Sequence, residues 1–265
     1  MAHSVEGRSS TLSSYLFGPS TGRPVLLIHG FASSTELNWA QTGWLTALEA
    51  AGRRVISVDL PGHGGSAAPE ALDEYTPSRI RAEILQLLSD LGTKPLDPAE
   101  PASGVDIIGY SLGSRLAWEF GAAQPELVHR LVLGGPAAID PLADFDLLAA
   151  ERFVSSGEPI VDPVTADLMN LAMLVPRNNM FALLSLVRAI KTEPFDATEA
   201  IPRRPVLLVA GERDELAETM PRLAELIASH GAEEPAEQLL LPARSHANAV
   251  TSRAFKEAAL RFLSD

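Results

Sequence analysis

The sequence of 265 residues contains no cysteine. Disulfides, thiolate metal ligands and a cysteine nucleophile are therefore excluded together. Basic residues are also scarce, because 21 lysines and arginines stand against 34 aspartates and glutamates, giving a formal net charge of −13. An acidic protein repels polyanions at long range, so the composition predicts neither nucleic acid nor an anionic membrane as a partner.

Long apolar runs are missing as well. Clean runs such as 25–28 are far too short to cross a bilayer. The first residues, Met1 to Glu6, lack the basic and apolar segments of a secretory signal. We therefore expect a cytoplasmic protein that does not enter a membrane. With 46% hydrophobic residues, the chain has enough apolar side chains for a sizeable core.

Short runs rich in valine, isoleucine and leucine recur along the chain. They do not alternate with polar residues, which indicates strands buried on both faces. These runs are 25–28, 55–58, 105–108, 131–133, 206–209 and 239–241. Amphipathic helical patterns lie between them, at about 40–51, 77–91, after Ser111 and at about 253–263. The alternation predicts an α/β fold with a doubly wound, mostly parallel sheet covered by helices on both faces.

One interval breaks this rhythm. About 70 residues separate the fourth and fifth of these runs, too many for a structureless loop. Patterned apolar stretches at 142–154 and 166–190 predict helices within it. We therefore expect a helical cap at 136–204, inserted into a core formed by 1–135 and 205–265.

The segment Gly109-Tyr110-Ser111-Leu112-Gly113 matches the pattern G-x-S-x-G. A predicted strand precedes it and a predicted helix follows, which is the context of a sharp turn that lifts a serine out of the sheet. A serine hydroxyl is a weak nucleophile, so it needs a base, and the base needs an acid that fixes its tautomer.

Suitable partners lie downstream, each directly after a predicted strand. Asp214 follows the run at 206–209, and His246 follows the run at 239–241. The order Ser111, Asp214, His246 is the order that this mechanism shows on a doubly wound sheet. We expect His3, His129 and His230 to be surface residues. Alternative acids are Glu212, Glu215 and, more distantly, Asp140.

Ser111, Asp214 and His246 in this order, together with three further motifs, make the sequence resemble the α/β-hydrolase fold family from about residue 15 to 263. His29-Gly30-Phe31 resembles its HG-x element, residues 59–66 its D-x-x-G-x-G-x-S turn, and residues 211–214 its G-x-x-D acid motif. The resemblance implies that the backbone N–H groups of Phe31 and Leu112 form the oxyanion hole. It also implies that His63 is a structural turn residue. One departure is Ser245, which stands before His246 where the family often has glycine.

A serine nucleophile argues against the relatives that use aspartate, the dehalogenases and epoxide hydrolases. Serine forms an acyl-enzyme, so the expected substrate is a small molecule with an activated carbonyl: an ester, lactone or thioester. The expected enzyme is a carboxylesterase that needs neither a metal nor an organic cofactor. Candidate substrate contacts are Tyr110, Arg115, Met169, Met173, Met180 and Phe181; the methionines and Phe181 suit an apolar acyl group, or simply pack the cap.

Two alternatives remain open. Residues 109–115 resemble the G-Y-S-x-G-x-R elbow of the menaquinone-pathway lyase that eliminates pyruvate from a cyclohexene dicarboxylate. That resemblance implies that Arg115 binds a carboxylate, assisted by cap arginines such as Arg152, Arg177 or Arg188. A third hypothesis is a signalling receptor that uses the triad to hold or hydrolyse a small ligand. The sequence leaves the oligomeric state undetermined.

Overall fold

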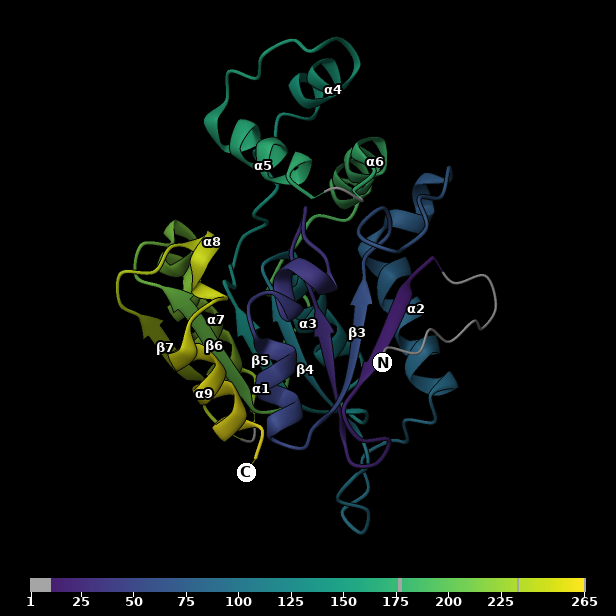
Figure 1. Ribbon diagram of the computed structural model, residues 1–265. Coiled ribbons are helices and arrows are strands. Elements are labelled where there is room, and N and C mark those ends of the chain that lie inside the picture. The colour runs from purple at the N-terminus through teal and green to yellow at the C-terminus, as the bar shows by residue number, and fades with distance from the viewer. Residues whose placement is uncertain (1–10, 176–177, 233, 265) are drawn as a thin grey trace.

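The computed structural model describes residues 11–175, 178–232 and 234–264. A seven-stranded sheet runs through it in the order β1-β3-β2-β4-β5-β6-β7 (Figure 1). Every pairing is parallel except the antiparallel pair of β1 with β3. The predicted α/β fold with a mostly parallel sheet is confirmed. The strands are β1 (Ser13–Phe17), β2 (Pro24–Ile28), β3 (Arg54–Asp59), β4 (Val105–Tyr110), β5 (Val128–Gly134), β6 (Val206–Gly211) and β7 (Glu237–Leu241).

Strand β1 has no counterpart among the apolar runs of the sequence. It pairs only with β3, with Ser13 opposite Asp59 and Phe17 opposite Val55. An edge strand keeps one side open to solvent, so its serines are tolerated and a continuous apolar run is not required. This is the reason that the hydrophobic pattern does not reveal it.

Helices cover both faces of the sheet. Helices α1 (Trp44–Ala50) and α9 (Arg253–Phe262) pack on one face, where the ring of Trp44 meets that of Phe255 at 4.8 Å. Helices α2 (Pro77–Asp90), α3 (Leu112–Ala123) and α7 (Met220–Ser229) pack on the other. The predicted start of the first helix at about residue 40 is too early. Gly43, with a φ of 81°, breaks the helical conformation between a short π-helix, Glu36–Ala40, and α1.

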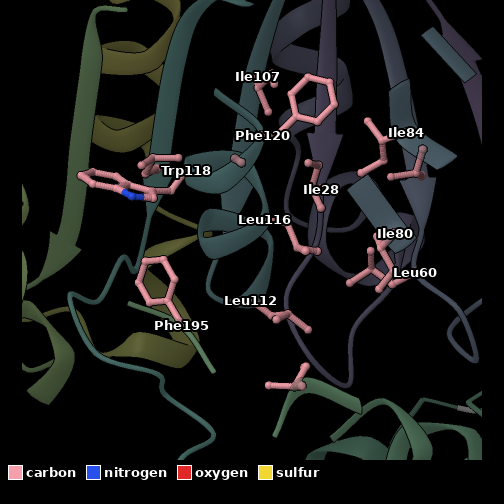
Figure 2. Close-up of a cluster of buried hydrophobic side chains, with 14 of the residues drawn as sticks. Ile28, Leu60, Ile80, Ile84, Ile107, Leu112, Leu116, Trp118, Phe120 and Phe195 are labelled. Carbon is pink, nitrogen blue, oxygen red and sulfur yellow. The ribbon is translucent and has the colours of Figure 1, made fainter. Parts of the chain in front are cut away.

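Helix α3 lies at the centre of the larger core. Leu116 and Phe120 on α3 meet Ile80 and Ile84 of α2 and Ile28 of β2 (Figure 2). Because α3 is buried on nearly all sides, its first residue is held rigidly at the carboxyl end of β4. The remaining short elements are Leu72–Tyr75, Glu215–Thr219 and α8 (His246–Ala249).

Three helices between β5 and β6 lie beyond the carboxyl ends of the strands (Figure 1). They are α4 (Leu147–Ser156), α5 (Pro163–Met173) and α6 (Met180–Ile190). The single helical stretch expected at 166–190 is two helices, because the side chain of Asn179 caps a new helix by accepting a hydrogen bond from the N–H of Ala182. Nowhere in 11–175, 178–232 or 234–264 is a helix long and apolar enough to span a membrane.

Candidate active site

Ser111 sits in the sharp turn between β4 and α3. Its φ of 55° and ψ of −117° are unusual for a residue with a side chain. The flanking glycines make the turn possible. A Cβ at Gly109 would lie 2.3 Å from the carbonyl oxygen of Gly113, and one at Gly113 would lie 2.0 Å from the carbonyl oxygen of Ile28. Strand and helix therefore approach closely, and the turn presents the serine hydroxyl at the rim of the sheet.

His246 and Asp214 meet Ser111 at this rim. The Nε2 atom of His246 lies 2.9 Å from Ser111 Oγ, and its Nδ1 atom lies 2.7 Å from Asp214 Oδ2. Carboxylate oxygens accept, so Nδ1 donates a hydrogen bond to Asp214, and Nε2 is left to accept one from the serine hydroxyl. The side chain of Asp214 is 1% exposed and that of His246 is 35% exposed. The chain of contacts thus runs from a buried acid to an accessible hydroxyl.

Asp214 is the carboxylate that contacts His246, and the alternative acids lie elsewhere. Its Oδ1 atom also accepts a hydrogen bond from the N–H of Leu216, at 3.1 Å, which fixes the carboxylate. Glu212 is exposed and accepts from the N–H of Ala243. Glu215 is exposed as well, and Asp140 pairs with Arg115.

The loop that carries His246 is held from below by Tyr110. The hydroxyl of Tyr110 donates a hydrogen bond to the carbonyl oxygen of His246, and the two rings lie 5.7 Å apart. Burial, and then the negative charge of Asp214, raise the pKa of Tyr110, so the hydroxyl keeps its proton. Tyr110 was expected among the substrate contacts. Its ring packs instead with Val132 and Phe255 in the core on the side of α1 and α9.

The loop after β2 lies directly against Ser111. A Cβ at Gly30 would be 3.1 Å from Ser111 Cβ, so the backbone of the loop passes beside the serine side chain. In the described part of the chain, the N–H groups of Phe31 and Leu112 donate no hydrogen bond. These are the two groups expected to form an oxyanion hole, and they remain available to an incoming acceptor.

Two buried histidines fix this loop. His63 Nε2 accepts a hydrogen bond from the N–H of Ala32 at 3.1 Å, while its Nδ1 donates to the carbonyl oxygen of Pro61. His29 donates through Nδ1 to the carbonyl oxygen of Gly30 and accepts from the N–H of Leu60. Burial lowers the pKa of His29, and it lowers that of His63 to about 3. Both rings are therefore neutral and hold the loop in place through their hydrogen bonds.

A narrow pocket opens beside Ser111 along helix α3. Arg115 and Trp118 line it from α3, and Pro136, Pro141 and Phe195 close it from the other side. Arg115 is 4% exposed and pairs with Asp140 at 2.9 Å. Its guanidinium also donates to the carbonyl oxygen of Glu193, lies 3.5 Å from Glu119 and covers the ring of Phe195. The charge of Arg115 is thus already balanced within the protein.

The cap side chains divide into two groups. Met169 is buried, and Met180 and Phe31 both pack against a small cluster of Ala32, Ala172 and Leu183. The ring of Phe31 also meets that of Phe145 edge-on at 6.1 Å. Met173 is half exposed and Phe181 is 67% exposed, so both face solvent. Arg152 pairs with Glu158 and Arg188 with Glu151 at the surface, while Arg177 lies outside the described residues.

Sequence reasoning missed three residues near Ser111. Gly135, with a φ of 56°, faces the imidazole of His246, and the pair of glycines at the end of β5 was a signal for it. Trp118 stands seven residues after Ser111 and so on the same face of α3. Phe195 arrives from the end of the cap, and no local pattern marks it. Among the described residues, no group of three histidines or carboxylates could hold a metal ion.

Comparison with known proteins gives relatives along much of the chain. A putative 2-succinyl-6-hydroxy-2,4-cyclohexadiene-1-carboxylate synthase from Bacillus subtilis is 28% identical over 225 residues, which is 75% of this chain and 76% of that protein. Other curated relatives, several of them epoxide hydrolases, are matched over 18% to 60% of their own length.

Solved structures of the same fold are also numerous. A carboxylesterase from Nitrososphaera gargenis superposes with a TM-score of 0.75 at 18% identity, covering 99% of this chain and 98% of the other. The enol-lactonase from Burkholderia xenovorans LB400 superposes with a TM-score of 0.74 at 23% identity, covering 96% of each chain. The sequence model of the alpha/beta hydrolase family matches residues 25–259. This chain therefore belongs to the alpha/beta hydrolase family.

Proposed function

We propose that the protein is a serine hydrolase that cleaves a small or medium carboxylic ester, lactone or thioester through an acyl-enzyme. One observation carries the proposal: Ser111 Oγ lies 2.9 Å from His246 Nε2, whose Nδ1 lies 2.7 Å from Asp214 Oδ2. This arrangement provides a nucleophile, a base within hydrogen-bond reach and an acid that orients the base.

The cycle uses only groups of this chain and water. His246 takes the proton of Ser111 as the hydroxyl oxygen attacks the substrate carbonyl carbon. The negative charge on the carbonyl oxygen is stabilised by the N–H groups of Phe31 and Leu112. His246 then gives the proton to the leaving group, and the acyl group stays on Ser111. Finally His246 activates a water molecule, which releases the acid and restores the serine.

The relatives support hydrolase activity as the general class of reaction. The family is one of hydrolases, and the structural neighbours include a carboxylesterase and an enol-lactonase. Epoxide hydrolases are relatives too, but their reaction requires a carboxylate nucleophile, and position 111 holds a serine.

A fluorophosphonate probe tests the proposal. It phosphonylates an activated serine, so the wild-type protein should be labelled and Ser111→Ala should not. Ser114→Ala is the matched control, because Ser114 Oγ is buried and bound to the carbonyl oxygens of Gly109 and Gly134. Labelling of Ser111→Ala at the wild-type rate, or hydrolysis of p-nitrophenyl butyrate by that variant, would refute the proposal.

A lyase is the second candidate, and the Bacillus subtilis relative favours it. Arg115 lies one turn past Ser111, where such an enzyme would bind a carboxylate. Against this, Asp140 and Glu119 already neutralise Arg115. Release of pyruvate from the corresponding cyclohexene dicarboxylate, followed by coupling to lactate dehydrogenase, would establish the lyase. Absence of pyruvate together with ester turnover would exclude it.

A further inference from the structure

The indole N–H of Trp118 is a buried donor without an acceptor. The side chain of Trp118 is 1% exposed, and its Nε1 atom has no hydrogen-bond partner within the described residues. Figure 2 shows this nitrogen on the edge of the ring that faces Phe195. Trp118 and Phe195 both line the pocket beside Ser111, so the unpaired N–H lies on the side of the ring toward that pocket. A buried donor of this kind calls for an explanation.

The pocket connects Trp118 to the nucleophile. Ser111, Arg115 and Trp118 stand at positions i, i+4 and i+7, so they share one face of α3. Seven residues of helix span about 10 Å. A group attached to Ser111 through its carbonyl would extend along this face toward Trp118. The enclosed part of the pocket has room for about one water-sized sphere, a volume of 10 Å³, so a larger occupant must be slender and must displace lining side chains.

The charges around the pocket favour an uncharged occupant. Arg115 supplies the positive charge of the lining, but it is paired with Asp140 at 2.9 Å and lies 3.5 Å from Glu119. Glu119 also pairs with Arg81. A carboxylate would have to compete with these acids for the guanidinium. The indole N–H, in contrast, is a neutral donor that can pair with any oxygen acceptor.

We propose that this pocket binds the acyl part of the substrate and selects a short acyl chain that carries an uncharged oxygen acceptor, such as a ketone or ether, for Trp118 Nε1. The inference rests on the proposed acyl-enzyme function and specifies its substrate class. An acyl chain with CH₂ in place of that oxygen leaves the buried N–H unpaired, and sites built around a donor discriminate against such analogues.

Pairs of esters with matched shape provide the test. In each pair an oxygen replaces a carbon group of similar size: p-nitrophenyl 3-methoxypropanoate against pentanoate, and 4-oxopentanoate against 4-methylpentanoate. The ratio of kcat/KM within a pair, divided by the ratio of alkaline hydrolysis rates, removes intrinsic reactivity. We expect this corrected ratio to favour the oxygen ester by about tenfold in at least one pair for the wild-type protein.

The variant Trp118→Phe removes the donor and keeps most of the ring. It should bring the corrected ratio close to one. Trp39→Phe is the matched control, because Trp39 Nε1 is also buried without a partner but belongs to the core on the other side of the sheet. This control should keep the wild-type ratio.

Each outcome is decisive for the inference. A corrected wild-type ratio of one in both pairs overturns it, and this measurement does not depend on how well the variant folds. A ratio that survives Trp118→Phe in folded protein also overturns it, as does a preference for the hemiglutarate ester, which carries a carboxylate. Fluorophosphonate labelling is checked first: unlabelled wild-type protein refutes the serine hydrolase, whereas labelled protein with a flat ratio refutes only the acceptor site.

Discussion

Gly135 lies so close to His246 that a methyl group in place of its hydrogen would be 2.8 Å from the imidazole Cε1 and 3.0 Å from Nδ1. We predict that Gly135→Ala displaces the imidazole from Ser111 and lowers kcat/KM for an activated ester by at least about 100-fold, because small misplacements of a reacting group are that costly. Steady-state kinetics with p-nitrophenyl butyrate measure the effect.

An alanine at position 135 has two effects: it adopts a strained backbone conformation and it contacts His246. Gly135 has a φ of 56°, and an alanine there costs about 1–2 kcal/mol. Gly52 has a similar φ of 67° with nothing near its missing side chain, so Gly52→Ala should lose comparable stability and keep full activity. If Gly52→Ala and Gly135→Ala lose activity equally, the contact with His246 is not the cause.

Tyr110 supports the loop of His246 through its hydroxyl. We predict that Tyr110→Phe lowers the free energy of unfolding by about 1 kcal/mol and also lowers kcat, because the carbonyl oxygen of His246 loses its donor. Tyr75→Phe is the control, since the Tyr75 hydroxyl donates to the carbonyl oxygen of Pro69 away from the site. It should lose similar stability in urea unfolding without any change in kcat. An unchanged kcat for Tyr110→Phe would show that the loop needs no such anchor.

His63 makes stability depend on pH. Burial lowers its pKa to about 3 in the folded protein, whereas an unfolded histidine titrates near about 6.5. The unfolded state therefore takes up the proton first. The contribution of His63 is complete above pH 6.5 and is lost progressively as pH falls toward 3, at about 1.4 kcal/mol per pH unit.

Urea unfolding at pH 7 and pH 5 measures this slope. His63→Asn should reduce the loss of stability between the two values, even though the variant is less stable at pH 7. His230 is exposed, and His230→Asn should leave the slope unchanged. An identical slope in His63→Asn and wild type would contradict the assignment of a neutral, buried ring.

We predict that Arg115 mainly stabilises the fold through its ion pairs. Arg115→Met leaves the largely buried carboxylate of Asp140 without its ion-pair partner and leaves Glu119 with Arg81 alone, so it should cost about 3–5 kcal/mol of unfolding free energy. Adding Asp140→Asn should recover part of this loss. Arg188→Met breaks an exposed pair with Glu151 and should cost less than about 1 kcal/mol. A loss for Arg115→Met no larger than that of Arg188→Met would show that the pair is not essential to the fold.

The sequence predicted the sheet well because buried parallel strands are continuous apolar runs. It missed β1, whose serines lie on an edge, and it merged α5 and α6 because apolar periodicity continues past the cap residue Asn179. Strand ends also predicted where Ser111, Asp214 and His246 would lie, since parallel strands deliver their following loops to one rim.

The orientation and partners of side chains were harder to predict than their position in the fold. Tyr110 is adjacent to Ser111 in sequence, but the alternation of side chains along a strand turns its ring to the opposite face of the sheet. Arg115 was expected to lie near Ser111, yet its charge is balanced by Asp140, and its guanidinium donates to the carbonyl oxygen of Glu193; both groups arrive from distant parts of the chain. Such contacts depend on tertiary packing, which no local pattern encodes.

The chain leaves the sheet after β5 and returns to it at β6, and these two strands are hydrogen-bonded neighbours. Because these strands are parallel, the chain departs at the carboxyl end of β5, at Gly134, and returns at the amino end of β6, where Val206 pairs with Leu131. A segment anchored at two points that the sheet fixes in this way can be lengthened, shortened or exchanged without altering how the strands align. Grafting another member's segment at this junction would thus offer a route to new selectivity while the proton-transfer groups stay in place.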